Sequence, residues 1–397
     1  MKILVHDFAG HPFTAELSRS LAARGHNVTH VWFSGDTGPK GRLSLLDDDA
    51  ETLSFLPLGA KIDYSKTNFV KRRRGDIAYG REVAEVIART RPDIVLSGNT
   101  PTEAQEPIVA ACRKAAVPFI YWCQDFYSIA ASRLLEAKLP VAGHLIGAYY
   151  RFLERRQMRR SARVLHITDS FRAQTDAWGI PATQVEVIPN WGALDEIPLT
   201  PRDTPWARAQ GLSDQARFVY SGTLAMKHNP AFLSGLAAEL AAGEQLVLVS
   251  NGVGVDHLQQ ESAQKDLKAL KILPLQPIAD LPSILGAGDV LLAVIEREAG
   301  IYSVPSKILS YLCAGRPIVL AAPADNLAAQ ILTQTGAGKV VEPEDIAGFI
   351  KAALSYRDDP EGAANAGAAG RAYAEAHFQM DRVCDRFETL FDAARKG

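Results

Sequence analysis

The stretch KILVHDFAGHPFTAELSRSLAARGHNVTHVWF, residues 2–33, contains one complete unit of the predicted fold. It opens on a short apolar strand and continues into a helical pattern, with Leu17, Leu21 and Ala22 at helical spacing. Gly25 is a residue type that commonly ends helices, and VTHVWF then forms a second strand. A strand, a helix and another strand in this order are typical of a parallel α/β sheet.

The same unit recurs along the rest of the chain. Further strands are expected at 93–98, 117–122, 163–167 and 185–190. Residues 194–215 are rich in Pro, Asp and Thr and have no periodicity, so we expect a linker there. A second series of strands follows, at 217–222, 245–252, 270–277, 289–296, 317–323 and 338–341. Strands that are apolar throughout are buried on both faces, which predicts parallel sheets covered by helices.

The 397 residues therefore divide into two α/β domains, each a doubly wound, Rossmann-like parallel sheet. We expect the N-terminal domain to span residues 1–198 and the C-terminal domain residues 199–376. The last helix, residues 377–397, is expected to pack back on the N-terminal domain. Two such domains joined by a linker face each other across a central cleft, and ligands bind outside the carboxyl ends of the strands.

Composition excludes several classes of protein. Apolar residues make up 47% and charged residues 22%, and the net charge is -2, so the chain is not a basic nucleic-acid binder. The longest stretch without a charged residue, 326–338, has 13 residues, too few to span a membrane. Four scattered cysteines and a start that reads as a strand lead us to expect a cytoplasmic protein.

Two segments of the second domain have features of a phosphate site. In VPSKILSYLCAGRPIVLAAP, residues 304–323, Ser306 is a candidate N-cap and Lys307 adds a positive charge where a helix exposes its unpaired N–H groups. In YSGTLAMKHNP, residues 220–230, Gly222 lets a ligand approach the backbone and Lys227 can contact phosphate. The alternatives are an ordinary helix–turn–strand unit and a solvated lysine.

In two segments of the first domain, polar residues follow the end of a predicted strand. HDFAGHPF places Gly10 and His11 in the first loop, but it is not a complete G-x-G-x-x-G, which argues against a dehydrogenase. WCQDFYS places Gln124 and Asp125 after a strand, where the carboxylate can orient a sugar hydroxyl or take a proton. A turn or helix-capping aspartate is the alternative. No metal-binding spacing of Cys and His is found in the sequence.

Positive charge is concentrated between residues 133 and 163, which hold eight basic and two acidic residues. The adjoining stretch LPVAGHLIGAYYRFL is apolar and contains two tyrosines. Such a basic, amphipathic segment can lie on an anionic membrane surface. A solvated helix face is the alternative. The run KRRR at 71–74 is a second candidate contact or an exposed loop.

Taken together, these strings resemble the retaining GT-B glycosyltransferases of the glycosyltransferase family 4 type, in particular bacterial exopolysaccharide, colanic-acid and O-antigen enzymes. The strings that carry the resemblance are ARGHNV, VIPNW, SGT followed by a lysine, and PSKILSYLCAGRPIV. The resemblance implies a GT-B fold and transfer of a sugar from a UDP- or GDP-sugar to an acceptor hydroxyl, with retention and without a metal or other cofactor.

The resemblance also implies roles for individual residues. Lys227 would bind the diphosphate, with Ser306 and Lys307 at the helix that faces the phosphates. Gln276 would lie beside the base of the nucleotide, and Gly10 would let the first loop approach the phosphates. The remaining donor contacts would come from Gly222, Thr223 and Ser310. The acceptor would bind His11, Gln124 and Asp125, and the catalytic residues would be Lys227, Asp125 and Glu298.

The chain departs from the family at several of these positions. Thr223 stands where the family has an arginine four residues before the lysine. The E-x7-E motif would align its glutamates with Tyr302 and Ser310, and Glu296 or Glu298 is the candidate to replace the first. Gln124-Asp125 stands where the family has histidine-aspartate.

The sequence thus predicts a hexosyltransferase-type enzyme of surface polysaccharide biosynthesis. Its expected partners are a nucleotide sugar, a saccharide or polyprenyl-diphosphate-linked acceptor and an anionic membrane surface at residues 151–163, but no nucleic acid. Its expected location is cytoplasmic, peripheral on the inner face of the membrane. A GT-B nucleotide-sugar epimerase or hydrolase and a non-catalytic nucleotide-sugar-binding protein remain alternatives.

Overall fold

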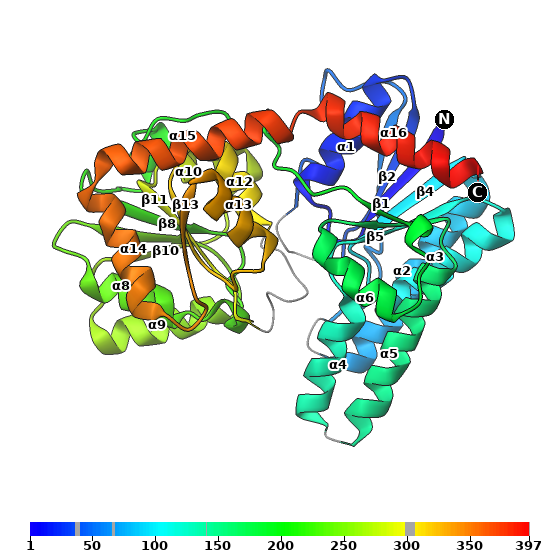
Figure 1. The fold of residues 1–397 in the computed structure, drawn as a ribbon, viewed down its shortest axis with the longest axis horizontal. Coiled ribbons are helices and arrows are strands. Elements are labelled where there is room, and N and C mark those ends of the chain that lie inside the picture. The colour runs from blue at the N-terminus through cyan, green and yellow to red at the C-terminus, as the bar shows by residue number, and fades with distance from the viewer. Residues whose placement is uncertain (36–39, 66–67, 140, 298–305, 397) are drawn as a thin grey trace. The chain divides into compact units, whose positions relative to one another are not determined.

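The computed structural model describes residues 1–35, 40–65, 68–139, 141–297 and 306–396. These residues form two compact units (Figure 1). Unit 1 comprises Met1–Pro189 with Met380–Gly397, and unit 2 comprises Asn190–Gln379. The chain therefore passes between the units at Pro189–Asn190, where the sequence pattern led us to expect a boundary at residue 198.

Within the described residues, unit 1 contains a sheet of seven parallel strands in the order β3-β2-β1-β4-β5-β6-β7. Their bounds are β1 (Lys2–Asp7), β2 (Asn27–Phe33), β3 (Leu53–Leu58), β4 (Ile94–Gly98), β5 (Phe119–Cys123), β6 (Arg163–His166) and β7 (Val185–Val187). The sequence pattern did not predict β3, which contains Pro57. A proline is tolerated there because β3 lies at the edge of the sheet, where one N–H can be missing.

Helices cover both faces of this sheet (Figure 1). Their bounds are α1 (Pro12–Ala23), α2 (Phe69–Thr90), α3 (Thr102–Ala115), α4 (Tyr127–Lys138), α5 (Ala142–Arg159), α6 (Arg172–Ala177) and α16 (Met380–Lys396). The last helix, α16, packs against α1. Arg24 donates hydrogen bonds to the carboxylates of Asp385 at 2.7 Å and Glu388 at 2.9 Å. The end of the chain thus completes the first unit.

Helices α4 and α5 form a hairpin that projects away from the sheet of unit 1 (Figure 1). The two helices approach closely because glycines line the contact. A Cβ atom on Gly143 would lie 2.3 Å from the carbonyl oxygen of Leu135, and one on Gly147 would lie 2.9 Å from Oγ of Ser132. Both distances are too short for any larger residue, so the glycines set the packing of the hairpin.

Unit 2 contains, within the described residues, six parallel strands in the order β10-β9-β8-β11-β12-β13. Their bounds are β8 (Arg217–Ser221), β9 (Gln245–Val249), β10 (Leu270–Leu273), β11 (Val290–Val294), β12 (Ile318–Ala321) and β13 (Gly338–Val341). All six lie within the predicted strands. The helices are α7 (Pro205–Ala209), α8 (Ala231–Glu239), α9 (Val253–Lys265), α10 (Leu281–Gly286), α12 (Lys307–Ala314), α13 (Leu327–Thr335), α14 (Ile346–Asp358) and α15 (Pro360–His377).

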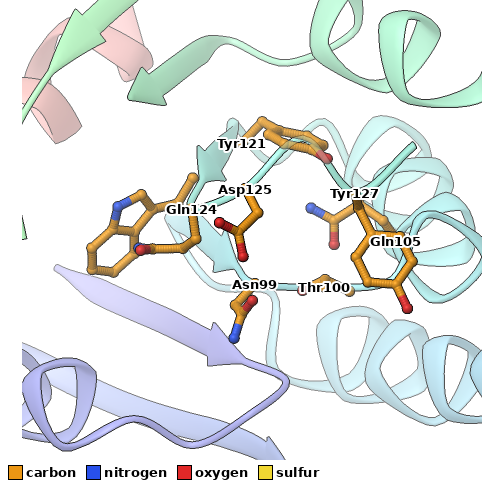
Figure 2. A pocket seen from close by; sticks show the side chains of 8 residues that line it. Asn99, Thr100, Gln105, Tyr121, Gln124, Asp125 and Tyr127 are labelled. Atoms are coloured by element: carbon orange, nitrogen blue, oxygen red, sulfur yellow. The ribbon is translucent and has the colours of Figure 1, made fainter. Parts of the chain in front are cut away.

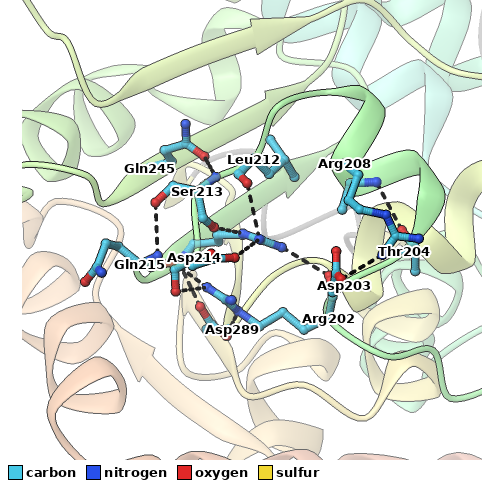
Figure 3. Close-up of polar contacts among 12 residues, drawn as sticks. Arg202, Asp203, Thr204, Arg208, Leu212, Ser213, Asp214, Gln215, Gln245 and Asp289 are labelled. Carbon is cyan, nitrogen blue, oxygen red and sulfur yellow. Dashed lines mark hydrogen bonds and ion pairs between the residues drawn. The ribbon is translucent and has the colours of Figure 1, made fainter.

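The stretch predicted as a linker, 194–215, is anchored to unit 2. It contains the short helix α7, and the guanidinium of Arg202 donates to Asp289 at 2.8 Å (Figure 3). Asp289 also accepts a hydrogen bond from the backbone N–H of Arg217, at the start of β8. The buried side chain of Arg217 donates in turn to the carbonyl oxygens of Ser213 and Arg202. These contacts make the stretch part of the domain.

None of the described helices combines the length and apolar composition that crossing a bilayer would require.

Three buried histidines of unit 1 should make the protein less stable in acid. Burial lowers the pKa of His6 to about 3, and of His30 and His166 to about 4. The unfolded chain therefore binds protons below pH ~6.5 that the folded chain does not. We expect the free energy of unfolding to fall by about 1.4 kcal/mol per histidine for each pH unit between about 6.5 and 4.

Urea unfolding at several pH values measures this dependence. Relative to the wild type, His30→Gln should reduce the loss of stability in acid by about 1.4 kcal/mol for each pH unit between about 6.5 and 4, whereas substitution of the exposed His144 should not change the pH dependence. The same pH dependence in His30→Gln as in the wild type would contradict the assignment of a neutral, buried His30 imidazole.

Candidate functional site

In both sheets the order of successive strands reverses at the first strand of the unit. In unit 1, β1 lies between β2 and β4, and in unit 2, β8 lies between β9 and β11. The connections that leave such neighbouring strands run to opposite faces of the sheet, which opens a crevice at their carboxyl ends. In unit 1 this edge is formed by the loops after β1 and β4. In unit 2 it is formed by the loops after β8 and β11. The candidate residues are described unit by unit below.

The loop after β1 is held by a buried aspartate, Asp7. Its carboxylate accepts hydrogen bonds from the backbone N–H of His11 at 2.6 Å and from the hydroxyl of Thr14 at 2.8 Å. Nδ1 of His11 lies 3.0 Å from the same carboxylate. Gly10, within this loop, has a φ of 72°, and a Cβ there would lie 2.6 Å from Leu43. The structure therefore gives Gly10 a turn and packing role.

The contact between Asp7 and His11 shifts both groups toward their charged forms. Burial alone would raise the pKa of Asp7, but His11 and the hydrogen-bond donors around the carboxylate lower it well below its usual range. Burial alone would lower the pKa of His11, but Asp7 and, more weakly, Asp125 raise it. His11 is still 28% exposed, so a partly charged imidazole reaches the surface of this edge.

A small pocket adjoins His11 at the carboxyl ends of β4 and β5. It is lined by Asn99, Thr100, Gln105, Tyr121, Trp122, Gln124, Asp125 and Tyr127 (Figure 2). The side-chain nitrogen of Asn99 lies 3.4 Å from both ring nitrogens of His11. Asn99 has a φ of 49°, a conformation that asparagine adopts more readily than most residues. The structure thus brings His11, Gln124 and Asp125 together, as expected for one binding site.

The far side of the pocket is fixed by a buried glutamate, Glu154 of α5. Its carboxylate accepts hydrogen bonds from the hydroxyl of Tyr121 at 2.9 Å and from the backbone N–H groups of Tyr127 and Ser128. Burial raises the pKa of Glu154 to about 7, against the effect of these donors. The hydroxyl of Tyr127 is buried and has no hydrogen-bond partner among the described residues. Tyr127 therefore offers a donor to a ligand.

In unit 2, the loop after β8 meets the beginning of α12. Gly222 has a φ of 109°, and a Cβ on it would lie 3.7 Å from Nζ of Lys307. The ammonium of Lys307 lies 3.5 Å from the centre of the Tyr220 ring. The hydroxyl of Tyr311, on the same helix, accepts a hydrogen bond from the backbone N–H of Ser221 at 3.0 Å. These contacts hold a lysine and a helix N-terminus against the end of β8.

Three further predicted donor residues belong to these same elements. Ser306 occupies the N-cap position of α12, but its side chain makes no capping hydrogen bond, so it does not perform the predicted capping role. Ser310 lies on α12, one turn after Ser306. The hydroxyl of Thr223, directly after Gly222, donates to the side-chain oxygen of Asn251 at 3.1 Å. The loops after β8 and β9 are thereby joined.

For most of the remaining predicted residues, the structure gives fewer contacts or does not describe the residue or its side chain. Lys227 lies in the 3-10 helix η3 (Met226–His228) that follows the loop after β8, and its side chain lies outside what the structure describes. Gln276 follows β10, and its side chain donates to the carbonyl oxygen of Pro274 at 2.9 Å. Glu298 and Tyr302 lie outside the described residues. Glu296 is described and exposed.

Sequence reasoning missed Asp7, Asn99, Tyr127 and Glu154. Asp7 ends buried strand β1 and Asn99 directly follows buried strand β4, so their positions alone would have drawn attention to them. No sequence pattern pointed to Glu154, because its partners come from residues 26 to 33 positions away. Among the described residues, no group of three or more His, Cys, Asp or Glu side chains is arranged to hold a metal ion.

The chain resembles known proteins in sequence and in fold. Residues 9–191 match the family described as glycosyl transferase 4-like domain. HepE from Anabaena, solved with UDP and glucose, superposes with a TM-score of 0.73 at 16% identity, covering 98% of this chain and 99% of HepE. The chain adopts the GT-B fold. The GT-B fold consists of two Rossmann-like domains, as units 1 and 2 show.

Two other GT-B structures are also similar over their full length. Sucrose-phosphate synthase from Thermosynechococcus elongatus has a TM-score of 0.75 at 14% identity, covering 99% of this chain and 98% of its own. WaaG, a glycosyltransferase involved in lipopolysaccharide biosynthesis, has a TM-score of 0.66 at 13% identity, covering 96% and 98%. No curated protein sequence matches the chain.

Proposed function

We propose that this protein is a glycosyltransferase that transfers a sugar from a nucleotide diphosphate sugar to a saccharide or a lipid-linked saccharide. The observation that carries the proposal is the match of residues 9–191 to the glycosyl transferase 4-like domain. It is supported by the GT-B fold and by the UDP and glucose bound in the similar HepE structure. We place the donor on unit 2 and the acceptor on unit 1.

The donor site would lie where Gly222 meets α12. The departing nucleotide diphosphate gains negative charge in the transition state, and cations and backbone N–H groups fixed in place stabilise that charge. Lys307, Lys227 and the N-terminus of α12 would supply them. Gly222 leaves room for phosphate oxygens at the backbone, since it has no side chain. Thr223, Ser310 and Gln276 would complete the donor contacts.

The acceptor site would be the pocket of unit 1. A sugar presents several hydroxyl groups, and the polar side chains of Asn99, Gln124 and Tyr127 can donate or accept hydrogen bonds to them. Asp125 would orient the reacting hydroxyl. His11, whose pKa the Asp7 carboxylate raises, would contact the acceptor.

We further propose retention at the anomeric carbon, in a hexosyl transfer without a metal. In a front-face displacement, the leaving phosphate oxygen accepts the proton of the acceptor hydroxyl while the new glycosidic bond forms and the bond to the phosphate breaks. Such a step needs no protein nucleophile. Glu298 and Glu296 are the candidates for the missing motif glutamate.

The pathway we propose is surface polysaccharide biosynthesis. The similar WaaG acts in lipopolysaccharide biosynthesis, and sequence strings of this chain resemble exopolysaccharide and O-antigen enzymes. In such a role the enzyme would work in the cytoplasm, on the inner face of the membrane, with a polyprenyl-diphosphate-linked acceptor.

A thermal-shift screen tests the proposal. The protein is mixed with UDP, GDP, ADP or dTDP, and then with their sugars. A ligand at about 100 times its dissociation constant stabilises the folded state by about 2.7 kcal/mol, so the correct nucleotide should raise the melting temperature clearly. No shift with any nucleotide would contradict the proposal. Donor consumption without an acceptor would indicate an epimerase or hydrolase, and binding without turnover a non-catalytic protein.

A further inference from the structure

Most of the large exposed apolar side chains described in unit 1 lie on one feature, the α4–α5 hairpin. Those on the hairpin are Leu134, Leu139, Val141, Leu145, Tyr149 and Phe152. Val141 is 82% exposed and Leu145 75% exposed. Residues 141, 145, 149 and 152 are spaced by four, four and three positions, so they form a single stripe along α5. A helix normally turns such a stripe toward the protein core.

The hairpin has its apolar stripe on the outside because its inner contact uses other residues. Gly143 and Gly147 face α4, where any Cβ would collide. Tyr150, Leu153 and Glu154 are the buried residues of the next turns. The outward stripe therefore contributes nothing to the packing of α4 on α5. An apolar surface of this kind on a projecting element is typical of an interaction site.

The surroundings of the stripe are basic. The first turn of α2 brings two more exposed apolar residues, Phe69 and Val70, followed by the basic run at 71–74. This turn adjoins the hairpin, since the guanidinium of Arg72 lies 5.5 Å from the centre of the Tyr127 ring. Arg73 pairs with the buried Glu103 at 2.8 Å, and Tyr149 on α5 helps to raise the pKa of Arg73. The hairpin itself adds Arg133 and Arg151, and Arg151 pairs with Glu136 at 3.1 Å, so the hairpin keeps a net positive charge.

The arginines further along α5, by contrast, are used inside unit 1. Arg156 donates to Glu106 at 2.6 Å, and Arg155 donates to the carbonyl oxygen of Trp178 at 2.8 Å. Arg163, the first residue of β6, donates to the carbonyl oxygen of Ala393 at 2.8 Å. Three arginines of the expected membrane contact at residues 151–163 therefore hold helices and strands of the domain together, and the contact itself stays a prediction.

We infer that the tip of the α4–α5 hairpin, with the first turn of α2, binds the surface of an anionic lipid bilayer. The apolar stripe enters the boundary between headgroups and acyl chains, and the basic side chains meet the anionic headgroups. The inference deepens the proposed function, on which it rests for the expectation of a lipid-linked acceptor. The pocket at Tyr127 lies at the base of the same hairpin.

Vesicle flotation with the full chain tests the inference. Vesicles of phosphatidylglycerol and phosphatidylcholine should carry the protein upward, and vesicles of phosphatidylcholine alone should carry far less. The double variant Leu145→Ser/Tyr149→Ser should lower partitioning at least about tenfold, because two large apolar side chains no longer enter the bilayer. The matched control Leu199→Ser/Val253→Ser removes two residues of unit 2 that are each 61% exposed, and it should bind like the wild type.

Three results would overturn the inference. The first is that the wild type does not bind anionic vesicles, and the second is that the hairpin variant binds them as well as the wild type does. The third is that an Arg159→Ala/Arg160→Ala variant loses binding while the hairpin variant keeps it. Light scattering that shows a dimer of the wild type, abolished by the hairpin substitutions, would assign the stripe to a second copy instead. The nucleotide-induced thermal shift should be the same in all variants, so its absence in the wild type would count against the proposed function alone.

Discussion

Lys227→Ala lowers kcat for sugar transfer by at least about tenfold if the proposed donor site is correct, because a fixed cation is removed from the developing charge on the diphosphate. Lys227 follows the loop that carries Gly222, and this loop reaches the N-terminus of α12. The lysine is expected to act more strongly on the transition state than on the bound donor. We therefore expect kcat to fall more than the KM for the donor rises.

Steady-state kinetics with the donor found in the thermal-shift screen measures this effect. Lys268→Ala is the matched control, because Lys268 is an exposed lysine of unit 2 that pairs with Asp266. Its removal should leave kcat unchanged. A Lys227→Ala enzyme with unchanged kinetics would remove this lysine from the mechanism, and Lys307 would then be the remaining described cation beside Gly222.

Asp7→Asn raises the KM for the acceptor by about tenfold or more, since hydrogen bonds to charged groups contribute about 1.5–3 kcal/mol. The substitution keeps the shape of the side chain but removes the negative charge that faces His11. The pKa of His11 should then fall below its ordinary value, because burial lowers it and Asp7 no longer raises it. A histidine NMR titration of the wild type and the variant measures this change directly.

The effect of Asp7→Asn on stability should depend on pH. The raised pKa of His11 contributes stability that is complete below about pH 6.5 and is lost as the pH rises through the folded-state value. The lowered pKa of Asp7 contributes stability that is complete above about pH 3.8. The variant should therefore be destabilised most between about pH 4 and 6.5.

Asp93→Asn is the control for this prediction. Asp93 is an exposed aspartate of unit 1 that accepts a hydrogen bond from the backbone N–H of Lys2, directly before β4. It should change neither the His11 titration nor the acceptor KM. If Asp7→Asn left the pKa of His11 where it is in the wild type, the ion pair would not control this loop.

The two sheets were largely predictable from sequence, because each central strand is a short apolar run buried on both faces. All residues of β4, β5, β8 and β11 are buried. Edge strand β3 was missed because Pro57 interrupts its pattern and its residues are only partly buried. The anchoring of the predicted linker 194–215 to unit 2 could not be predicted, because the hydrogen bonds of Arg202 and Arg217 that anchor it join residues distant in sequence.

The candidate sites were predictable where the loop after a buried strand carries a polar residue or a glycine, as at His11, Asp125 and Gly222. The sequence does not show that Arg155, Arg156 and Arg163, all within the charge run at 133–163, have partners in other elements. The apolar stripe was present in the sequence as residues 141, 145, 149 and 152. Helical periodicity reveals such a stripe but does not tell whether it faces the core or the solvent.

A crystal structure of the protein with its nucleotide diphosphate tests the central claim most directly. The account predicts that the two phosphates lie against Gly222 and the N-terminus of α12, within hydrogen-bonding distance of the Lys307 ammonium. Phosphates bound elsewhere, or at the first loop of unit 1 without contact to α12, would contradict it.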